Sequence, residues 1–516
     1  MRHRPQWRRV ACGAAMLFAA AALATALAWN SIFEAVYNSQ LALSPSSRSY
    51  REWVAPEVPL YLEIYLFNWT NPDDFPHQKP ILAEVGPFRF REYRRHVNVS
   101  VYPNNGTIAY RTQRTWHYDE DTSEASLQDN ITILNVIAAS AAFRSRDWGF
   151  LKQKGLSLAL AMFGHGMSVS KLAGELLFDG YEDPLIDLAN SLPPSALGGA
   201  PKVDRFGLFY GRNNSIDTDG YMEVTSGSSS EIPGQIVRWD GHSSLPFYGG
   251  ECAKNSDFNS RVGNSGYQVS YQGYSLFTPM TGSAGEFMPH NLTESEPLTI
   301  FMSDLCRTVY MDYRESGTLE GIPYHKYVMN EATFDYSSTT DRNSCFCNGE
   351  CMWSGVMNVS ACRYGSPSFL SLPHFLHGDP DLLDKLEGLT PDPDLHTFYF
   401  AVEPRLGIPL DVSARFQYNV YLEPMPNIAL YANVPKMLFP IFWVQQKVQV
   451  ESKVLGELRI VRGVLDWGGT VCACAALVFA ALLTVTSCCS SHCKKNDERK
   501  KEKDEAELKL NPNNRS

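Results

Sequence analysis

The stretch VPLYLEIYLF, from Val58 to Phe67, decides the fold class of this chain of 516 residues. Aliphatic residues alternate along it with tyrosine, glutamate and other residues, which is the period-two pattern of a strand that packs on both faces. Residues 97–101 (VNVSV) alternate in the same way and are followed by Asn105-Gly106, a dipeptide that accepts the positive φ of a tight hairpin turn. We therefore expect a hairpin that returns over 108–111.

Further strands are expected late in the chain, because residues 398–402 and 412–422 alternate in the same way. The middle differs: residues 131–143 and 151–177 are rich in alanine and leucine and contain no proline, which predicts helices. The fold class is therefore mainly β with α, around an antiparallel core. Within the second helix, residues 156–163 (LSLALAMF) are apolar on nearly every face, which leaves a helix buried between others and a lipid-contacting patch as alternatives.

Two uncharged segments predict membrane anchors. Residues 10–29 are about 20 residues long, the length that a helix needs to cross a bilayer core of about 30 Å. A cleavable signal peptide is the alternative, because Ala26-Leu27-Ala28 has the pattern of a cleavage site. Residues 468–487 form the second segment. Arginines precede the first segment and lysines follow the second, so both termini are expected in the cytosol.

The expected division of the chain follows from these anchors. Residues 1–9 form a cytosolic N-terminus, 10–29 a transmembrane helix, 30–465 an extracellular or lumenal ectodomain, 466–488 a transmembrane helix and 489–516 a cytosolic tail. No long linker or internal repeat divides the ectodomain. A formal charge of -11 and the lack of a basic patch outside the terminal flanks argue against nucleic acid as a partner.

Sequons give an independent test of this topology, because Asn-x-Ser/Thr is modified only on the lumenal side, in exposed loops. The acceptors between the anchors are Asn68, Asn98, Asn105, Asn130, Asn213, Asn291 and Asn358. Asn514 lies in the expected cytosolic tail and should stay unmodified.

The 12 cysteines divide by position. The even set in the ectodomain, expected to form disulfides in an oxidising compartment, is Cys252, Cys306, Cys345, Cys347, Cys351 and Cys362. Spacing alone leaves their pairing open, and a zinc site at Cys345, Cys347, Cys351 and Cys362 is the competing interpretation. At the second anchor, Cys488, Cys489 and Cys493 are candidates for palmitoylation, with unmodified thiols as the alternative.

Motifs for catalysis are missing from the sequence. The two strings nearest to a Gly-x-Ser-x-Gly elbow, at 241–245 and 166–170, lack the final glycine. There is also no His-Glu-x-x-His motif, no Walker loop and no Gly-x-Gly-x-x-Gly fingerprint. We therefore expect no catalytic residues, no metal and no cofactor, and the chain is not expected to be an enzyme.

Several strings, in order, resemble those of the class B scavenger receptor family, which includes fatty acid translocase, the lysosomal integral membrane protein and insect sensory neuron membrane proteins. The strings are NPDDF (71–75), KPILAEVGPF (79–88), GYEDP (180–184), GLFY (207–210), RWDG (238–241), CFC (345–347) and SLPHFL (371–376). With two anchors and the ectodomain cysteines, the resemblance covers nearly the whole chain.

The resemblance implies a large antiparallel β-barrel, a membrane-distal helical bundle and an apolar tunnel through which lipid moves from a distal entrance toward the bilayer. It also implies the pairs Cys252–Cys345, Cys306–Cys362 and Cys347–Cys351. The entrance would be formed by Leu151, Lys152, Lys154, Leu158, Met162 and Phe163. The family has lysines in this helix that are thought to meet lipid carboxylates; here the corresponding place falls on Ala161, and the nearest cations are Lys152, Lys154 and Lys171.

The expected function is a receptor that binds lipids or other hydrophobic ligands and transfers them to the membrane through the tunnel. A receptor for protein, lipoprotein or particle cargo is the alternative. The plasma membrane is the expected location, with the endosomal or lysosomal membrane as the alternative, because the tail after Cys493 has no clear sorting motif.

Overall fold

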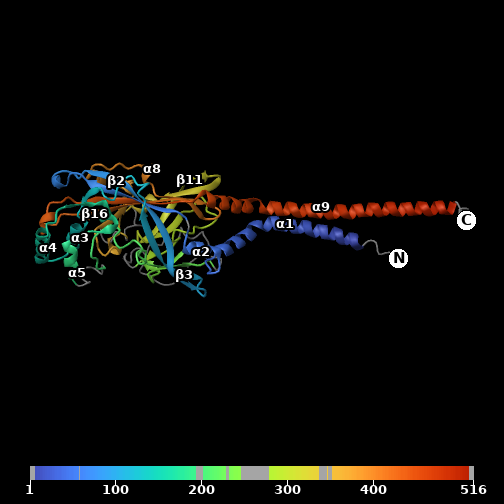
Figure 1. Ribbon diagram of the computed structural model, residues 1–516, viewed down its shortest axis with the longest axis horizontal. Coiled ribbons are helices and arrows are strands. Elements are labelled where there is room, and N and C mark those ends of the chain that lie inside the picture. Colours follow the sequence, from blue (N-terminus) through green and yellow to red (C-terminus); the bar gives the residue numbers. More distant parts are fainter. Residues whose placement is uncertain are drawn as a thin grey trace. The chain divides into compact units, whose positions relative to one another are not determined.

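The computed structural model describes residues 6–56, 58–192, 201–227, 232–245, 278–335, 346 and 351–510. Gln40–Glu451 forms one compact unit, and the terminal segments Met1–Ser39 and Ser452–Ser516 form the other. Figure 1 labels the elements of both.

The larger unit is built on a 13-stranded antiparallel sheet. Its main path follows the order β10 (Leu298–Met302), β11 (Arg307–Leu319), β12 (Ile322–Met329), β15 (Tyr399–Glu403), β16 (Ile408–Leu422), β17 (Met437–Gln449), β1 (Leu60–Trp69), β2 (Leu82–Tyr102), β3 (Thr107–Tyr118), β6 (Tyr221–Thr225) and β7 (Ile236–Trp239). Beside this path, β13 (Val356–Asn358) pairs with β14 (Ser368–Ser371), which pairs with β16. Two short pairs lie apart from it: β4 (Asn130–Leu134) with β5 (Ser168–Leu172), and β8 (Ser244–Leu245) with β9 (Thr278–Pro279).

A short segment brings the two ends of the path together. Ser283 bridges to Gln235, next to β7, and also to Ile300 of β10. Its backbone N–H donates to the Thr299 carbonyl at 3.0 Å, and the Ile236 N–H donates to the Gly282 carbonyl at 2.9 Å. The sheet is therefore a large, nearly closed antiparallel barrel, as the sequence pattern and the resemblance predict.

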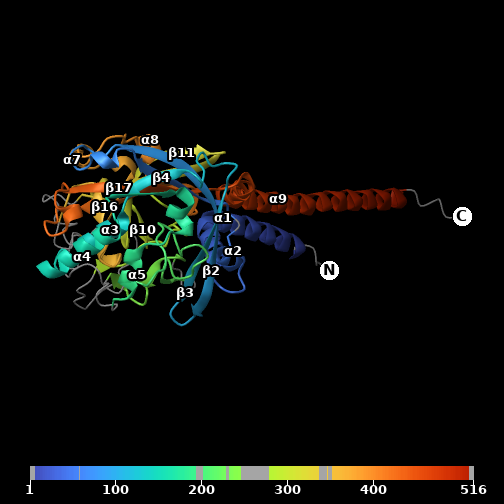
Figure 2. The same cartoon turned by 60° about the vertical axis from the view of Figure 1, so that its left-hand side comes forward.

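Helices gather at one end of this unit. They include α3 (Val136–Arg144), α4 (Phe150–Met162) and α5 (Pro184–Asn190), and Figures 1 and 2 both show these three together at the end of the sheet. The short helices α2 (Arg48–Val54) and α8 (Pro393–His396) lie elsewhere on the unit (Figure 1), and α7 (Pro380–Leu383) is labelled in Figure 2. The 3-10 turn at Ala429–Tyr431, before β17, contacts α4.

The predicted strands are confirmed, whereas the predicted helices end elsewhere. Residues 130–134 form β4 rather than the start of a helix, because β-branched Ile131, Thr132 and Ile133 alternate between the two faces of the β4–β5 pair. The second predicted helix ends at Met162, where Gly164 adopts a positive φ of 70°. After it come β5 and a π-helical turn at Glu175–Asp179.

The second unit consists of α1 (Gln6–Leu41) and α9 (Ser452–Leu510). Their stretches Gly13–Leu41 and Ser452–Thr486 are long and apolar enough to cross a membrane. The Trp29 indole donates a hydrogen bond of 3.1 Å to the Val464 carbonyl, and its ring lies so close to Gly468 that a Cβ there would be 2.2 Å from it. Phe18 contacts Phe479 edge to face, with ring centroids 5.1 Å apart. The helices therefore pack in antiparallel directions.

Candidate functional site

Helix α4 presents apolar side chains outward from the barrel unit. Leu151, Leu158 and Met162 leave 82%, 61% and 73% of their surfaces exposed, and their spacing places them on one face of the helix. Phe163, at the end of the helix, is 40% exposed. A surface helix normally turns such a face toward the core, so this arrangement requires an explanation.

Two uncharged polar residues of α4 face inward, whereas its lysines are exposed. Gln153 is buried; its amide nitrogen donates to the Ser145 carbonyl at 2.9 Å, and its amide oxygen accepts from the Asn427 side chain at 2.7 Å. The Ser157 hydroxyl accepts the Ala429 N–H at 3.0 Å. Hydrogen bonds to the loop before β17 thus hold α4 in an orientation that exposes its apolar face.

This arrangement contradicts one of the two alternatives for α4 and leaves the lipid-contacting patch as a prediction. The buried-helix interpretation is wrong, because Leu160 is the one large apolar side chain of α4 that is fully buried in the described structure. The six predicted entrance residues lie together on α4 and at its C-terminal end, whereas Lys171 lies on β5, with its ammonium 5.1 Å from the Tyr181 ring centre. Gln153 and Ser157, four residues apart, were the sequence signal that identifies the inward face.

Along β16 the inward side of the barrel is packed less tightly than the outward side. The inward Ala414, Phe416 and Tyr418 are only half-buried, although they lie in the middle of the sheet. The outward Ser413 and Gln417 leave 1% and 0% of their surfaces exposed. The looser packing is local to this strand, because Ile64 of β1, which shares the face of Phe416, is fully buried.

Charged side chains from several elements meet on this inward side. Their ion pairs are Arg94–Glu92 at 2.8 Å, Arg114–Asp219 at 2.8 Å, Arg363–Asp304 at 3.4 Å and Arg212–Asp304 at 3.9 Å. The register places Glu92 beside Trp116 and near Gln446, and both side chains donate to its carboxylate, at 3.0 and 2.9 Å. We call these seven arginines and acids the interior charge cluster. The sequence does not single these residues out, because β2 also carries Arg89, Arg91 and Arg95.

Burial raises the pKa of the acids in this cluster, whereas the arginines lower it. Burial favours the neutral form of Glu92 and Asp304, but Arg94 and Arg114 outweigh it for Glu92, and Arg114 and Arg363 do so for Asp304, so the pKa of each is lowered. For Asp219 burial prevails over Arg114, and its pKa is raised. Burial acts on all three acids, and the nearby arginines determine which of them keep a lowered pKa.

An aromatic cluster adjoins the interior charge cluster. Phe209 lies under the Arg212 guanidinium, whose central carbon is 5.8 Å from the ring centre. The Phe209 ring also contacts Phe178 at 5.3 Å and Phe442 at 5.6 Å, and Phe442 stacks on Tyr418 at 5.4 Å. Apolar rings and guanidinium groups therefore border each other inside the barrel.

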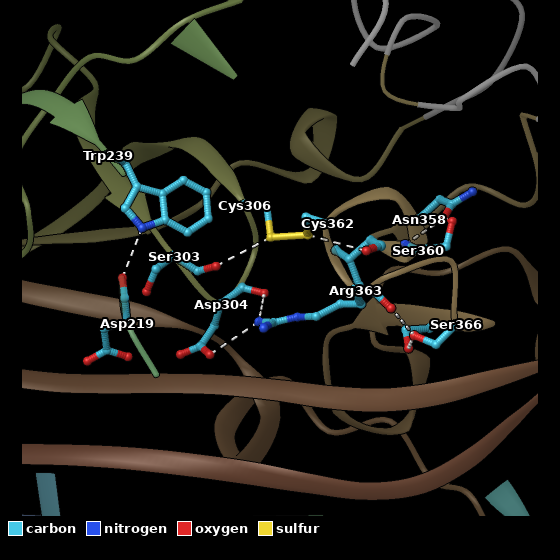
Figure 3. The surroundings of a disulfide bond; sticks show 12 residues. Asp219, Trp239, Ser303, Asp304, Cys306, Asn358, Ser360, Cys362, Arg363 and Ser366 are labelled. Carbon is cyan, nitrogen blue, oxygen red and sulfur yellow. Dashed lines mark hydrogen bonds and ion pairs between the residues drawn. A yellow bond between two sulfur atoms is a disulfide. The ribbon is translucent and has the colours of Figure 1, made fainter. Parts of the chain in front are cut away.

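A disulfide holds part of the interior charge cluster in place. Cys306 and Cys362 are bonded, the pair that the family resemblance implies. Figure 3 shows Asp304 and Arg363 beside this bond, with the Arg363 guanidinium directed at Asp304, and a hydrogen bond of 2.9 Å joins it to the Asp304 carbonyl. Because Cys362 is bonded to Cys306, it is unavailable to the alternative zinc site.

The other predicted cysteine pairs fall largely outside the described residues. Cys351 is disulfide-bonded, and Cys252, Cys345 and Cys347 lie outside the described part of the chain. For the palmitoylation candidates Cys488, Cys489 and Cys493 the structure describes the α9 backbone and not the side chains.

Most predicted glycosylation acceptors lie at the surface. The exposed ones are Asn98, Asn105, Asn130, Asn213 and Asn291. Asn68 and Asn358 are half-buried, and the Asn68 side-chain oxygen accepts the Thr132 N–H at 2.9 Å. Glycosylation of Asn68 and Asn358 would therefore require a local change in their packing.

Two buried histidines lie on the outer side of the barrel. His374 stacks on His396 with ring centres 4.3 Å apart, and it shares the Glu84 carboxylate with the Trp443 indole, at 2.6 and 2.7 Å. The His396 ring nitrogen Nδ1 accepts the Asp392 N–H at 2.9 Å. Burial and the adjacent His374 lower the pKa of His396 to about 4.

Comparisons with known proteins agree with this architecture. The family model described as "CD36 family" matches residues 11–491. Protein peste of Drosophila melanogaster is 32% identical over 86% of this chain and 78% of its own length. Scavenger receptor class B member 1 of Mus musculus is 29% identical over 88% of this chain and 83% of its own, and lysosome membrane protein 2 of Homo sapiens is 27% identical over 81% of each. Two apolar end helices, a nearly closed antiparallel barrel and a family match over most of the length lead to one conclusion: this chain is a membrane protein of the CD36 family.

Proposed function

We propose that this chain is a receptor that captures lipids or other hydrophobic ligands at α4 and passes them through the barrel interior to the membrane. The observation that carries the proposal is the orientation of α4, which buries hydrogen-bonded Gln153 and exposes Leu151, Leu158 and Met162. Exposing such a face to water has a cost, which an apolar ligand would remove. No catalytic step is part of the proposal.

The inward face of the barrel supports an internal path. Asp304 and Arg212 leave 49% and 34% of their side chains exposed, yet both are desolvated by protein: burial lowers the pKa of Arg212, and for Asp304 burial acts against Arg114 and Arg363, which together lower its pKa. A side chain that is open to small molecules but desolvated by surrounding protein fits a lumen better than an outer surface. Each methylene that moves from water into such a lumen gains about 0.8 kcal/mol.

The position of α4 supports its role as the entrance. The loop that holds it precedes β17, a strand of 13 residues that runs to Gln449, just before α9 begins. At about 3.3 Å per residue, β17 spans about 40 Å. Ligand captured at α4 would therefore travel along the barrel toward the end where the chain leaves for its membrane helix.

The test is uptake of a fluorescent lipid by cells, divided by the number of receptors at the surface. Changing Leu158 and Met162 together to Asp should lower uptake severalfold at near-normal surface expression, because the charges oppose desolvation of an apolar ligand. Leu395→Asp is the matched control, since Leu395 in α8 is 59% exposed and lies outside α4. Normal uptake by the double variant would rule out α4 as the entrance.

A receptor for protein cargo is the second candidate, because the exposed face of α4 also suits an apolar protein surface. One relative is named as a lysosome membrane protein and another as a scavenger receptor. Mass spectrometry of the purified full-length protein separates the two candidates. Lipid carrying predicts a stoichiometric bound lipid that the Leu158/Met162 double variant loses, whereas cargo binding alone predicts none. We propose the plasma membrane as the location, with both termini in the cytosol.

A further inference from the structure

The interior charge cluster has an excess of positive charge. Its arginines are Arg94, Arg114, Arg212 and Arg363, and its acids are Glu92, Asp219 and Asp304. Glu286 adds a negative charge near Arg94, but the charged groups that act on Arg212 are Asp304, Arg363, Asp219 and Arg114. This part of the cluster therefore has three arginines and two acids. A cation without a close partner in desolvated surroundings is costly, so this part of the cluster favours the arrival of an anion.

Arg212 is the arginine of the cluster whose guanidinium has no close acidic partner. Arg363 reaches Asp304 through both the carbonyl and the carboxylate, at 2.9 and 3.4 Å. Arg212 reaches the same carboxylate only at 3.9 Å, and within the described part of the chain its guanidinium makes no hydrogen bond. Burial lowers its pKa, which reflects the cost of holding this cation without a close partner. Its N–H donors are therefore available to an oxyanion.

The surroundings of Arg212 define what kind of anion would fit. The guanidinium lies over the Phe209 ring, which contacts Phe178 and Phe442. A small inorganic anion has no apolar part that could pack against these rings. An acyl chain would pack against them while its charged end reached the guanidinium, which presents two parallel donors to a carboxylate or phosphate.

We propose that Arg212 binds the anionic head group of a single-chain lipid inside the barrel, with the chain packed against Phe209 and its aromatic neighbours. The site rests on the lipid-carrying function proposed above and adds selectivity to it. It makes the interior prefer an acid over a neutral lipid of the same chain. Carboxylate and phosphate are the two head groups with the required chemistry.

The experiment uses full-length protein in phosphatidylcholine nanodiscs and three photo-crosslinking probes that share one acyl chain and differ in their end group. The ends are a carboxylate, a phosphate and a neutral hydroxyl. Labelled peptides around Phe209 and Phe442 are quantified by mass spectrometry. We expect both anionic probes to label them more strongly than the alcohol, and Arg212→Gln to reduce the acid-to-alcohol ratio about tenfold, because the acid would lose its hydrogen bonds to a charged group.

Arg205→Gln is the matched control, because Arg205 pairs with Glu182 at the surface and its loss removes the same charge outside the interior charge cluster. The acid-to-alcohol labelling ratio of Arg205→Gln should equal that of the unchanged protein. An unchanged ratio in Arg212→Gln, with alcohol labelling intact, would overturn the head-group site and leave the lipid-carrying function standing. Absence of interior labelling by all three probes would instead refute that function.

Two further outcomes are informative. If Arg212→Gln fails to fold, the alcohol probe loses its labelling as well, and the unchanged protein then decides the question: equal labelling by acid and alcohol overturns the site, and a preference for the acid supports it. The phosphate probe identifies the source of the anion. Stronger labelling than the carboxylate points to phospholipid-like ligands, and weaker labelling points to fatty acids.

Discussion

Individual side chains inside the barrel depend on a covalent link beside them. Asp304 lies just before Cys306 in the chain, and Arg363 directly follows Cys362. Because these two cysteines are joined, Asp304 and Arg363 approach each other. The bond spans a sequence separation of 56 residues, so it removes many conformations from the unfolded chain. The ion pair alone could not hold the two loops at this distance.

We expect Cys306→Ser to destabilise the ectodomain by about 2 to 5 kcal/mol, the usual cost of losing a native disulfide. The Cys362 thiol would also be left free to pair wrongly. Surface delivery and the melting temperature of the purified protein measure the effect. Cys472→Ser in α9 is the control, because Cys472 is an exposed free cysteine. Normal delivery and stability of Cys306→Ser would contradict the structural role of this bond.

The histidine pair should make the fold sensitive to acid. His396 has a folded pKa of about 4 against an ordinary value of 6.5, so between these pH values the unfolded chain binds more protons than the folded one. The free energy of unfolding should therefore fall as pH drops through this window, by up to about 1.4 kcal/mol per pH unit. Burial, and then His374, cause the shift.

His396→Asn should reduce this acid sensitivity, because its side-chain oxygen can accept the Asp392 N–H without titrating. Denaturant unfolding of the full-length protein at pH 7.5 and pH 5 provides the measurement. His77→Asn serves as the comparison, since His77 lies in the exposed turn after Asp74. An equal loss of stability in unchanged protein and His396→Asn would show that His396 does not contribute.

Secondary-structure elements differ in how well the sequence predicts them. The β1 strand and the β2–β3 hairpin were predictable because alternation and the Asn105-Gly106 turn are local signals. The end of α4 was not, because a run of alanine and leucine resembles a helix even where Gly164 stops it. The outward orientation of α4 depends on Asn427, more than 250 residues away. The polar Gln153 and Ser157 mark the inward face locally, but their distant partner cannot be read from the sequence around α4.

The interior charge cluster could not be predicted for the same reason. Its members come from β2, β3 and the loops around residues 212, 219, 304 and 363, and only the folded barrel brings them together. The sequence does show charged residues at alternate positions of β2. It does not show whether they face the lumen or the surface, because a shift of one residue reverses the two faces.

The contact between α1 and α9 predicts that the first helix is retained as an anchor. Trp29 lies against Gly468 and donates to the Val464 carbonyl, and α1 continues past it to Leu41. Cleavage after Ala28 would remove the part of α1 that contains Phe18, and with it the contact between Phe18 and Phe479. Mass spectrometry of the mature protein should therefore recover peptides that precede Trp29. A mature N-terminus at Trp29 would contradict the anchor.

The molecule as a whole combines features that would each be unfavourable in an ordinary soluble protein. One is an apolar helix face turned outward on α4, and another is the inward side of β16, which is packed less tightly than its outward side. A third is a desolvated charge cluster bordered by aromatic rings. The proposed receptor, which would take in a hydrophobic ligand, lead it along the barrel and select it by its head group, would account for all three.

The central claim is that lipid passes through the barrel interior, and blocking that interior tests it most directly. Ala414 faces inward and is half-buried, so Ala414→Trp would fill the path with an indole, whereas Lys447→Trp adds the same group on the opposite side of the sheet. The measurement is fluorescent lipid uptake per surface receptor. The account predicts that Ala414→Trp reaches the surface and takes up at least about tenfold less lipid, while Lys447→Trp behaves as the unchanged protein. Normal uptake by surface-expressed Ala414→Trp would contradict passage through the barrel.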